Sequence, residues 1–85
     1  MKHQRQRVSD IFAYNINTVK SHCEAHPDFS PSRITWAQEP IKNKHIIVVK
    51  STDGYHIVLY APSRKQAKLL VSTLCLLYGA TQKEL

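Results

Sequence analysis

The stretch that decides the fold is KHIIVVKSTDGYHIVLYAPSRKQ, residues 44–66. Two runs rich in β-branched and aromatic residues flank the dipeptide Asp53-Gly54. A two-residue type I′ turn suits this dipeptide, because both residues tolerate the positive φ angles that the turn requires. The sequence therefore predicts a β-hairpin over residues 44–61.

Helices are predicted on both sides of this hairpin. Ser63 and Gln66 form a capping box, in which each side chain reaches the backbone amide of the other, and Gly79 is a natural stop. Nearer the N-terminus, apolar residues recur at spacings of three and four over residues 9–24, which is the period of one helical face. Pro27 ends that helix, because the residue before a proline disfavours the α conformation.

A third strand is predicted at residues 33–39, where apolar and polar side chains alternate before Pro40. The element order is therefore α-β-β-β-α. We expect an α+β fold with a three-stranded antiparallel sheet and two helices on one face. Residues 1–8 form a basic N-terminal arm, residues 9–79 a single domain, and residues 80–85 a frayed C-terminus.

With Asp53 and Gly54 as the two turn residues, both faces of the hairpin are apolar. One face would carry four large apolar side chains, Ile47, Val49, Val58 and Tyr60. The helices cover only one face of the sheet, and monomeric proteins avoid large exposed apolar patches. We therefore expect a symmetric homodimer formed through a sheet face or edge.

The charge balance favours a polyanionic partner. The chain has 85 residues, 12 Lys and Arg against 6 Asp and Glu, and a net charge of +6. RNA or another nucleic acid is the expected partner, although a ribosomal or acidic-protein partner would fit the same charge. No apolar run approaches the ~20 residues needed to cross a bilayer, and two cysteines are too few for a disulfide framework. We therefore expect a cytoplasmic protein with no membrane association.

The strongest candidate for phosphate binding is the start of the second helix. Arg64, Lys65 and Lys68 lie where backbone amides and the helix dipole already favour an anion. Cations there disfavour the helix by roughly 0.3–1 kcal/mol each, and a bound phosphate reverses the sign of that penalty. An ordinary solvated helix face is the alternative reading. The full set of candidate nucleic-acid contacts is Arg64, Lys65, Lys68, Lys44, Lys42, Arg33, Arg5, Arg7 and Tyr55.

Four aromatic side chains are candidates for stacking on unpaired bases, Trp36, Tyr55, Tyr60 and Tyr14. Trp36 belongs to an alternating strand, which is typical of a core residue. Tyr55 stands beside the turn and is expected to be the most exposed of the four.

Metal binding and catalysis have weaker signals. His22, Cys23 and His26 are close in sequence, but on a helix Cys23 points about 100° away from His22. We assign no metal ligand and no cofactor. His45 and His56 are candidate general bases that lie on one face at opposite ends of the hairpin, roughly 20 Å apart. They cannot form an acid–base pair within one subunit, so no catalytic residue is assigned.

The segment SRKQAK, residues 63–68, resembles the start of the second helix of the double-stranded RNA-binding domain, which reads Ser-Lys-Lys-x-Ala-Lys. The resemblance spans residues 9–79 and implies that Arg64, Lys65 and Lys68 contact phosphates. The family's minor-groove loop with its Gly-Pro-x-His pattern is absent here, because the hairpin turn is too short to hold it. The resemblance therefore extends to the fold and not to recognition of a duplex.

Two further resemblances concern function. HicA-type messenger-RNA interferases share this fold and use a central-strand histidine, which corresponds to His45, although Asn43-Lys44 replaces their Gly-Ser/Thr. In its size, charge and single domain, the chain is also similar to small accessory proteins of large tailed phages. Among them is the TifA class, which blocks an RNase toxin of a host toxin-antitoxin system through RNA.

We therefore expect a non-enzymatic, dimeric RNA-binding protein of low sequence specificity. The phage resemblance implies inhibition of a host RNase toxin. One alternative is a HicA-like ribonuclease that uses His45. Another is an inhibitor that docks a host protein on an apolar sheet face.

Overall fold

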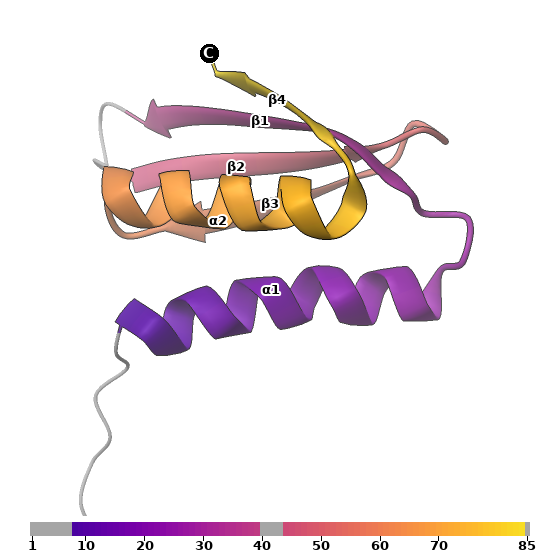
Figure 1. The fold of residues 1–85 in the computed structure, drawn as a ribbon, viewed down its shortest axis with the longest axis horizontal. Helices are drawn as coiled ribbons and strands as arrows, with labels where there is room; N and C mark the ends of the chain where they lie inside the picture. Colours follow the sequence, from indigo (N-terminus) through magenta and orange to yellow (C-terminus); the bar gives the residue numbers. More distant parts are fainter. Residues whose placement is uncertain (1–7, 40–43, 85) are drawn as a thin grey trace, which may run out of the picture.

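The computed structural model describes residues 8–39 and 44–84, which form an α+β fold of two helices and one four-stranded sheet (Figure 1). The elements in chain order are α1 (Val8–Ala25), β1 (Pro31–Glu39), β2 (Lys44–Ser51), β3 (His56–Ala61), α2 (Arg64–Tyr78) and β4 (Thr81–Glu84). The strand order is β3-β2-β1-β4; β2 pairs antiparallel with β1 and β3, and β4 runs parallel to β1. All five elements predicted from the sequence are present, but the predicted three-stranded antiparallel sheet is wrong because the sheet is four-stranded and mixed.

The additional strand, β4, comes from the segment that was expected to fray. Gly79 ends α2 in the left-handed conformation (φ 65°), and its N–H donates to the carbonyl of Cys75 at 2.8 Å. The chain then runs beside β1, where Thr81 pairs with Arg33 and the Thr81 hydroxyl donates to the carbonyl of Ser32 at 3.2 Å. A four-residue polar strand whose partner is distant in the sequence leaves almost no periodic signal.

The hairpin turn enclosed by the Ser51–Tyr55 pair contains three residues, not the expected two. The N–H of Ser51 donates to the carbonyl of Tyr55 at 2.8 Å, which leaves Thr52, Asp53 and Gly54 as the loop. Gly54 has φ 96°, as expected where a three-residue hairpin loop places its last residue in a left-handed conformation. The register therefore differs by one residue from the predicted one, and such a shift reverses the faces of one strand relative to the other.

The shifted register decides which hairpin side chains enter the core. Val58 and Tyr60 lie on the outer face of the sheet, 42% and 53% exposed, and not with Ile47 and Val49 as the two-residue turn would have required. The apolar side chains of β2 and β3 that pack inward are Ile47, Val49, Ile57, Leu59 and Ala61. The outer face of the hairpin therefore carries Ile46 and Val48 beside Val58 and Tyr60, in place of Ile47 and Val49.

Helix α2 packs across the sheet, and α1 lies beside it. Helix α2 contacts all four strands, whereas α1 contacts α2 and β3 but neither β1 nor β2 (Figure 1). The core residues that the two helices supply are Val19 of α1 and Ala67, Leu70, Val71 and Leu74 of α2. Neither helix is both long and apolar enough to span a membrane. Because α1 is displaced toward β3, the helix and this edge strand can form the two walls of a groove.

Candidate nucleic-acid interface

Among the described residues, four cations lie at the end of the molecule where α2 begins, and we call this set the basic end. Arg64, Lys65 and Lys68 are exposed in the first two turns of α2, and the first turn contains no acidic residue. Lys44 is exposed at the start of β2. It lies at the same end because the start of β2 pairs with the end of β3, just before α2 begins.

The first turn of α2 has the predicted N-cap but only one of the two bonds of the predicted capping box, since the N–H of Ser63 makes no hydrogen bond with the Gln66 side chain. Ser63 is the N-cap with φ −150°, and its hydroxyl accepts a hydrogen bond from the N–H of Gln66 at 3.2 Å. The N–H groups of Arg64 and Lys65 have no partner within the helix, because no carbonyl precedes them at the required spacing. The dipole of the 15-residue helix adds partial positive charge at this point. Amides and side-chain cations together favour a bound anion.

Arg64 is held at the rim of the core by an aromatic side chain. Its Cζ lies 5.6 Å from the centroid of the Trp36 ring, a cation–π contact. Trp36 is 4% exposed, and its Nε1 donates to Nδ1 of His45 at 3.2 Å. The contact fixes the face of the guanidinium, so its edge N–H groups remain able to bind a phosphate.

His45 is positioned as a core residue. It is 6% exposed, and its Nδ1 already accepts the hydrogen bond from Trp36. The prediction that His45 and His56 share a face is wrong, since the three-residue loop places His45 inward and His56 outward. Burial of His45 leaves it poorly placed to take a proton from a bound substrate.

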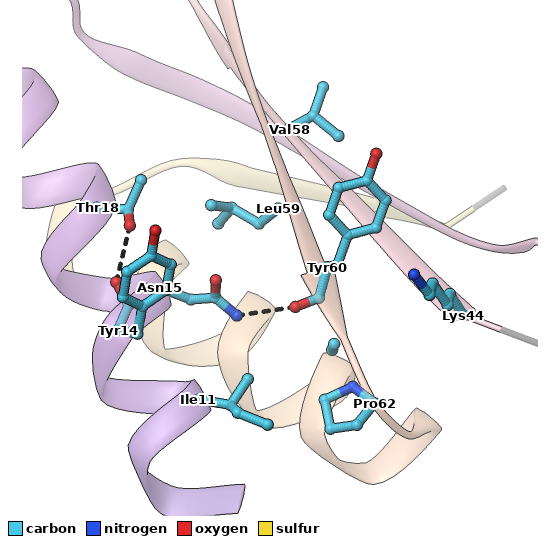
Figure 2. A pocket seen from close by; sticks show the side chains of 10 residues that line it. Ile11, Tyr14, Asn15, Thr18, Lys44, Val58, Leu59, Tyr60 and Pro62 are labelled. Atoms are coloured by element: carbon cyan, nitrogen blue, oxygen red, sulfur yellow. Dashed lines mark hydrogen bonds between the residues drawn. The ribbon is translucent and has the colours of Figure 1, made fainter. Parts of the chain in front are cut away.

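A groove with a volume of about 470 Å³ runs between α1 and the edge strand β3 (Figure 2). Tyr14 of α1 and Tyr60 of β3 stand on its two walls, 66% and 53% exposed. Asn15 ties the walls together, because its Nδ2 donates to the carbonyl of Tyr60 at 3.0 Å. Lys44 also lines the groove, with its Nζ 5.7 Å from the centroid of the Tyr60 ring. The groove is therefore continuous with the basic end.

The outer edge of β3 supplies backbone hydrogen-bonding groups to this groove. The carbonyl of Tyr60 points away from β2, because Asn15 reaches it from α1. Backbone groups of alternate residues point to the same side of a strand, so the N–H and C=O of Val58 point outward as well. Among the four described strands none lies on this side of β3. Val58 thus offers one donor and one acceptor to a ligand.

The opposite end of the molecule has a different electrostatic character. A second cavity, also of about 470 Å³, is lined by Asp28, Asp53 and three histidines, with no Lys or Arg among its lining residues. The rings of His22 and His26 lie 4.5 Å apart there. Across the described ranges, no three His, Cys, Asp or Glu side chains are grouped closely enough to hold a metal ion. Within this cavity a polyanion would meet the carboxylates of Asp28 and Asp53.

The carboxylate of Asp53 is stabilised in its charged form. Two hydrogen bonds lower the pKa of Asp53. The larger effect comes from a bond with the Ser51 side chain, and the second comes from the N–H of Tyr55, which donates to the carboxylate at 3.1 Å. The side chain is therefore negative at neutral pH, which strengthens the contrast with the basic end.

Two further predicted site residues, Arg33 and Tyr55, do not join the basic end. Arg33 pairs with Lys50 near the hairpin turn, and Tyr55, which is 72% exposed, lines the second cavity. Three predicted contacts lie outside the described residues, Lys42, Arg5 and Arg7.

Sequence reasoning missed Asn15 and the groove that it helps to form. Its signal was a polar side chain between Phe12, Ile16 and Val19, on the apolar face of the predicted helix. Comparison of the chain with protein-family models, with curated proteins and with solved structures finds no match.

Proposed function

We propose that this protein binds RNA, mainly through phosphate contacts made by the basic end and with low sequence specificity. The observation that carries the proposal is the position of Arg64, Lys65 and Lys68. All three are exposed in the first two turns of α2, the end of the helix where backbone amides have no partner within the helix, in a chain whose net charge is +6. Positive side chains weaken a helix at this end, so their presence there is better explained by an anionic ligand than by stability.

The charge distribution supports one binding end. Lys44 extends the basic end onto the sheet, while the second cavity at the far end carries Asp28 and Asp53. A nucleic acid lying along the basic end and the adjoining groove would avoid these carboxylates. Inhibition of a host RNase toxin through its RNA, the role implied by the phage resemblance, would use the same surface.

The proposal includes a homodimer, which would present two basic ends to one RNA strand. The exposed apolar side chains available for such a contact lie on the outer face of β3 and on the outer side of α2. They are Val58, Tyr60, Leu69, Leu76 and Leu77. Leu76 is 87% exposed, which is unusual for a leucine on a helix that covers the core. The same apolar side chains would serve an inhibitor that docks a host protein. The burial of His45 weighs against a ribonuclease that uses it as a base.

A pair of charge-reversal variants tests the proposal. Arg64→Glu/Lys65→Glu changes the basic end, and Arg33→Glu/Lys50→Glu makes the same charge change near the hairpin turn. Fluorescence anisotropy would measure the affinity of each for a labelled single-stranded RNA of about 20 nucleotides at about 100 mM salt, and we expect the first variant to lose about tenfold or more. The second should stay within about threefold of wild type.

Circular dichroism would show that both variants are folded. Equal losses in the two variants would mean that net charge, and not the basic end, governs binding. Failure of the wild-type protein to bind RNA at low salt would refute the proposed function.

A further inference from the structure

We infer that the groove between α1 and β3 holds one unpaired nucleotide, with its base against Tyr60 and its phosphate at Lys44, so that the ligand is single-stranded RNA. This inference rests on the proposed function and names the class of RNA that the surface takes. Three features of the groove support this inference: the exposed aromatic rings, the neighbouring cation and the open edge of β3.

The groove presents aromatic surface where a base can stack. Tyr14 and Tyr60 are more than half exposed and both line the groove, Tyr14 from α1 and Tyr60 from the outer face of β3 on the Lys44 side, with the apolar side chains of Val58 and Pro62 also in the lining (Figure 2). Stacking on an aromatic side chain is available to every base, because every base has two π faces. A base in a duplex has both faces covered by its neighbours, so it cannot use these rings.

A cation stands next to the stacking surface. The Nζ of Lys44 is 5.7 Å from the centroid of the Tyr60 ring. A nucleotide whose base rests on the open part of that ring carries its phosphate one sugar away, within reach of Lys44. The other members of the basic end, at the start of α2, are then placed to contact the phosphates that follow in the strand.

The edge of β3 adds polar recognition of an unpaired base. The outward N–H and C=O of Val58 form a donor and acceptor pair beside the groove. Proteins that bind single-stranded RNA read the free Watson–Crick edges of unstacked bases with such groups. A duplex has no free Watson–Crick edge to offer.

An extended peptide is the main competing occupant, because edge strands can accept another strand. Asn15 already occupies the carbonyl of Tyr60 at 3.0 Å, which interrupts the ladder that an added strand would need. A single planar base needs only the groups of Val58. The structure therefore favours a nucleotide over a peptide strand.

Aromatic substitutions test the inference directly. Tyr60→Ala removes the ring beside Lys44, and Tyr55→Ala is the matched control, because Tyr55 is also exposed but lines the other cavity. Fluorescence anisotropy would measure the affinity of each variant for a single strand of about 12 nucleotides and for a duplex that contains the same sequence. Tyr60→Ala should weaken binding to the single strand by about 5- to 100-fold. It should leave duplex binding within about twofold and the salt dependence unchanged, because the phosphate contacts remain. Tyr55→Ala should match wild type on both ligands.

Two conservative variants separate the ring from the fold. Tyr60→Phe keeps a stacking surface and should bind the single strand like wild type, whereas Tyr60→Leu keeps apolar bulk without a ring and should bind like Tyr60→Ala. A fluorescent base analogue in the single strand should lose emission on binding to wild type and not to Tyr60→Leu.

Several results would overturn the inference. They are equal wild-type affinity for duplex and single strand, full single-strand affinity of Tyr60→Ala and Tyr60→Leu, or displacement of the groove-bound base analogue by an extended peptide. In each case the wild-type protein still binds RNA, so the proposed function survives. Absence of wild-type RNA binding would instead remove the proposed function itself.

Discussion

Replacement of Asn15 by alanine should destabilise the protein, because this side chain joins α1 to the edge of the sheet. Asn15 is 5% exposed, and its Nδ2 donates to the carbonyl of Tyr60 at 3.0 Å, between residues 45 positions apart in the sequence. Without the amide, that carbonyl loses its partner in a partly buried position, which costs about 1–3 kcal/mol. In a domain of this size, a loss of about 1 kcal/mol in the free energy of unfolding lowers Tm by about 4–8 °C. Even the smallest expected destabilisation of Asn15→Ala is therefore a readily measured shift in Tm.

Thermal unfolding followed by circular dichroism, with urea unfolding as a second measurement, would give the free energy of unfolding. Thr18→Val is the matched control on the same helix. The Thr18 hydroxyl donates to the carbonyl of Tyr14 at 2.9 Å within α1, and that exposed bond ties no second element. We expect the control to stay within about 0.5 kcal/mol of wild type. An Asn15→Ala protein as stable as the Thr18→Val protein would refute the role given to the α1–β3 link.

Three further predictions concern the loop, the thiols and the oligomeric state. The lowered pKa of Asp53 contributes stability that is present above the ordinary aspartate pKa and is lost as pH falls through the pKa of the folded state. Asp53→Asn should therefore be less stable than wild type at pH 7. Urea unfolding should show that this difference in the free energy of unfolding shrinks below about pH 4. An undiminished difference at low pH would contradict this. Burial raises the pKa of the free thiols Cys23 and Cys75. Iodoacetamide should therefore alkylate both thiols more slowly at pH 7 in the folded protein than in urea. Equal alkylation rates would contradict this effect of burial. Static light scattering should give about twice the monomer mass of 9.8 kDa, and a monomer at about 100 μM would contradict the homodimer. Leu76→Glu should yield monomers if the dimer forms through α2, and it should leave the dimer intact if the dimer forms through the sheet.

The boundaries of α2 were predictable because their signals are local. Ser63 and Gly79 are read from sequence as cap residues, and each performs that role through bonds to residues three or four positions away. The basic end was predictable for the same reason, since three of its four members belong to the first two turns of one helix.

The hairpin register was not predictable, because Asp53-Gly54 suits a loop of two or three residues equally well. The Ser51 hydroxyl accepts hydrogen bonds from the N–H of Asp53 at 3.3 Å and from the N–H of Ser30 at 2.9 Å. The second of these bonds comes from the segment before β1, so the contact that fixes the loop is not local. The one-residue difference changed which side chains face the core and separated His45 from His56.

The groove and β4 also depend on contacts between distant segments. Strand β4 is fixed beside β1 by pairs such as Thr81 with Arg33, and α1 is placed beside β3 by Asn15 and by packing against α2. A periodic pattern shows that a helix has an apolar face but not which element it packs against. The position of α1 at the sheet edge, and with it the stacking surface of Tyr60, could be found only in the structure.

The most direct test of the RNA-binding surface is the salt dependence of its affinity for single-stranded RNA. Four phosphate contacts at about 0.7 each predict a slope of log K against log salt of about −2.8, which is about a 50-fold loss between 50 and 200 mM salt. Contacts by Arg5, Arg7 and Lys42 would steepen this slope. Lys65→Ala/Lys68→Ala should make it shallower by about 1.4. A slope near zero, or one that the double variant leaves unchanged, would contradict phosphate binding by the start of α2.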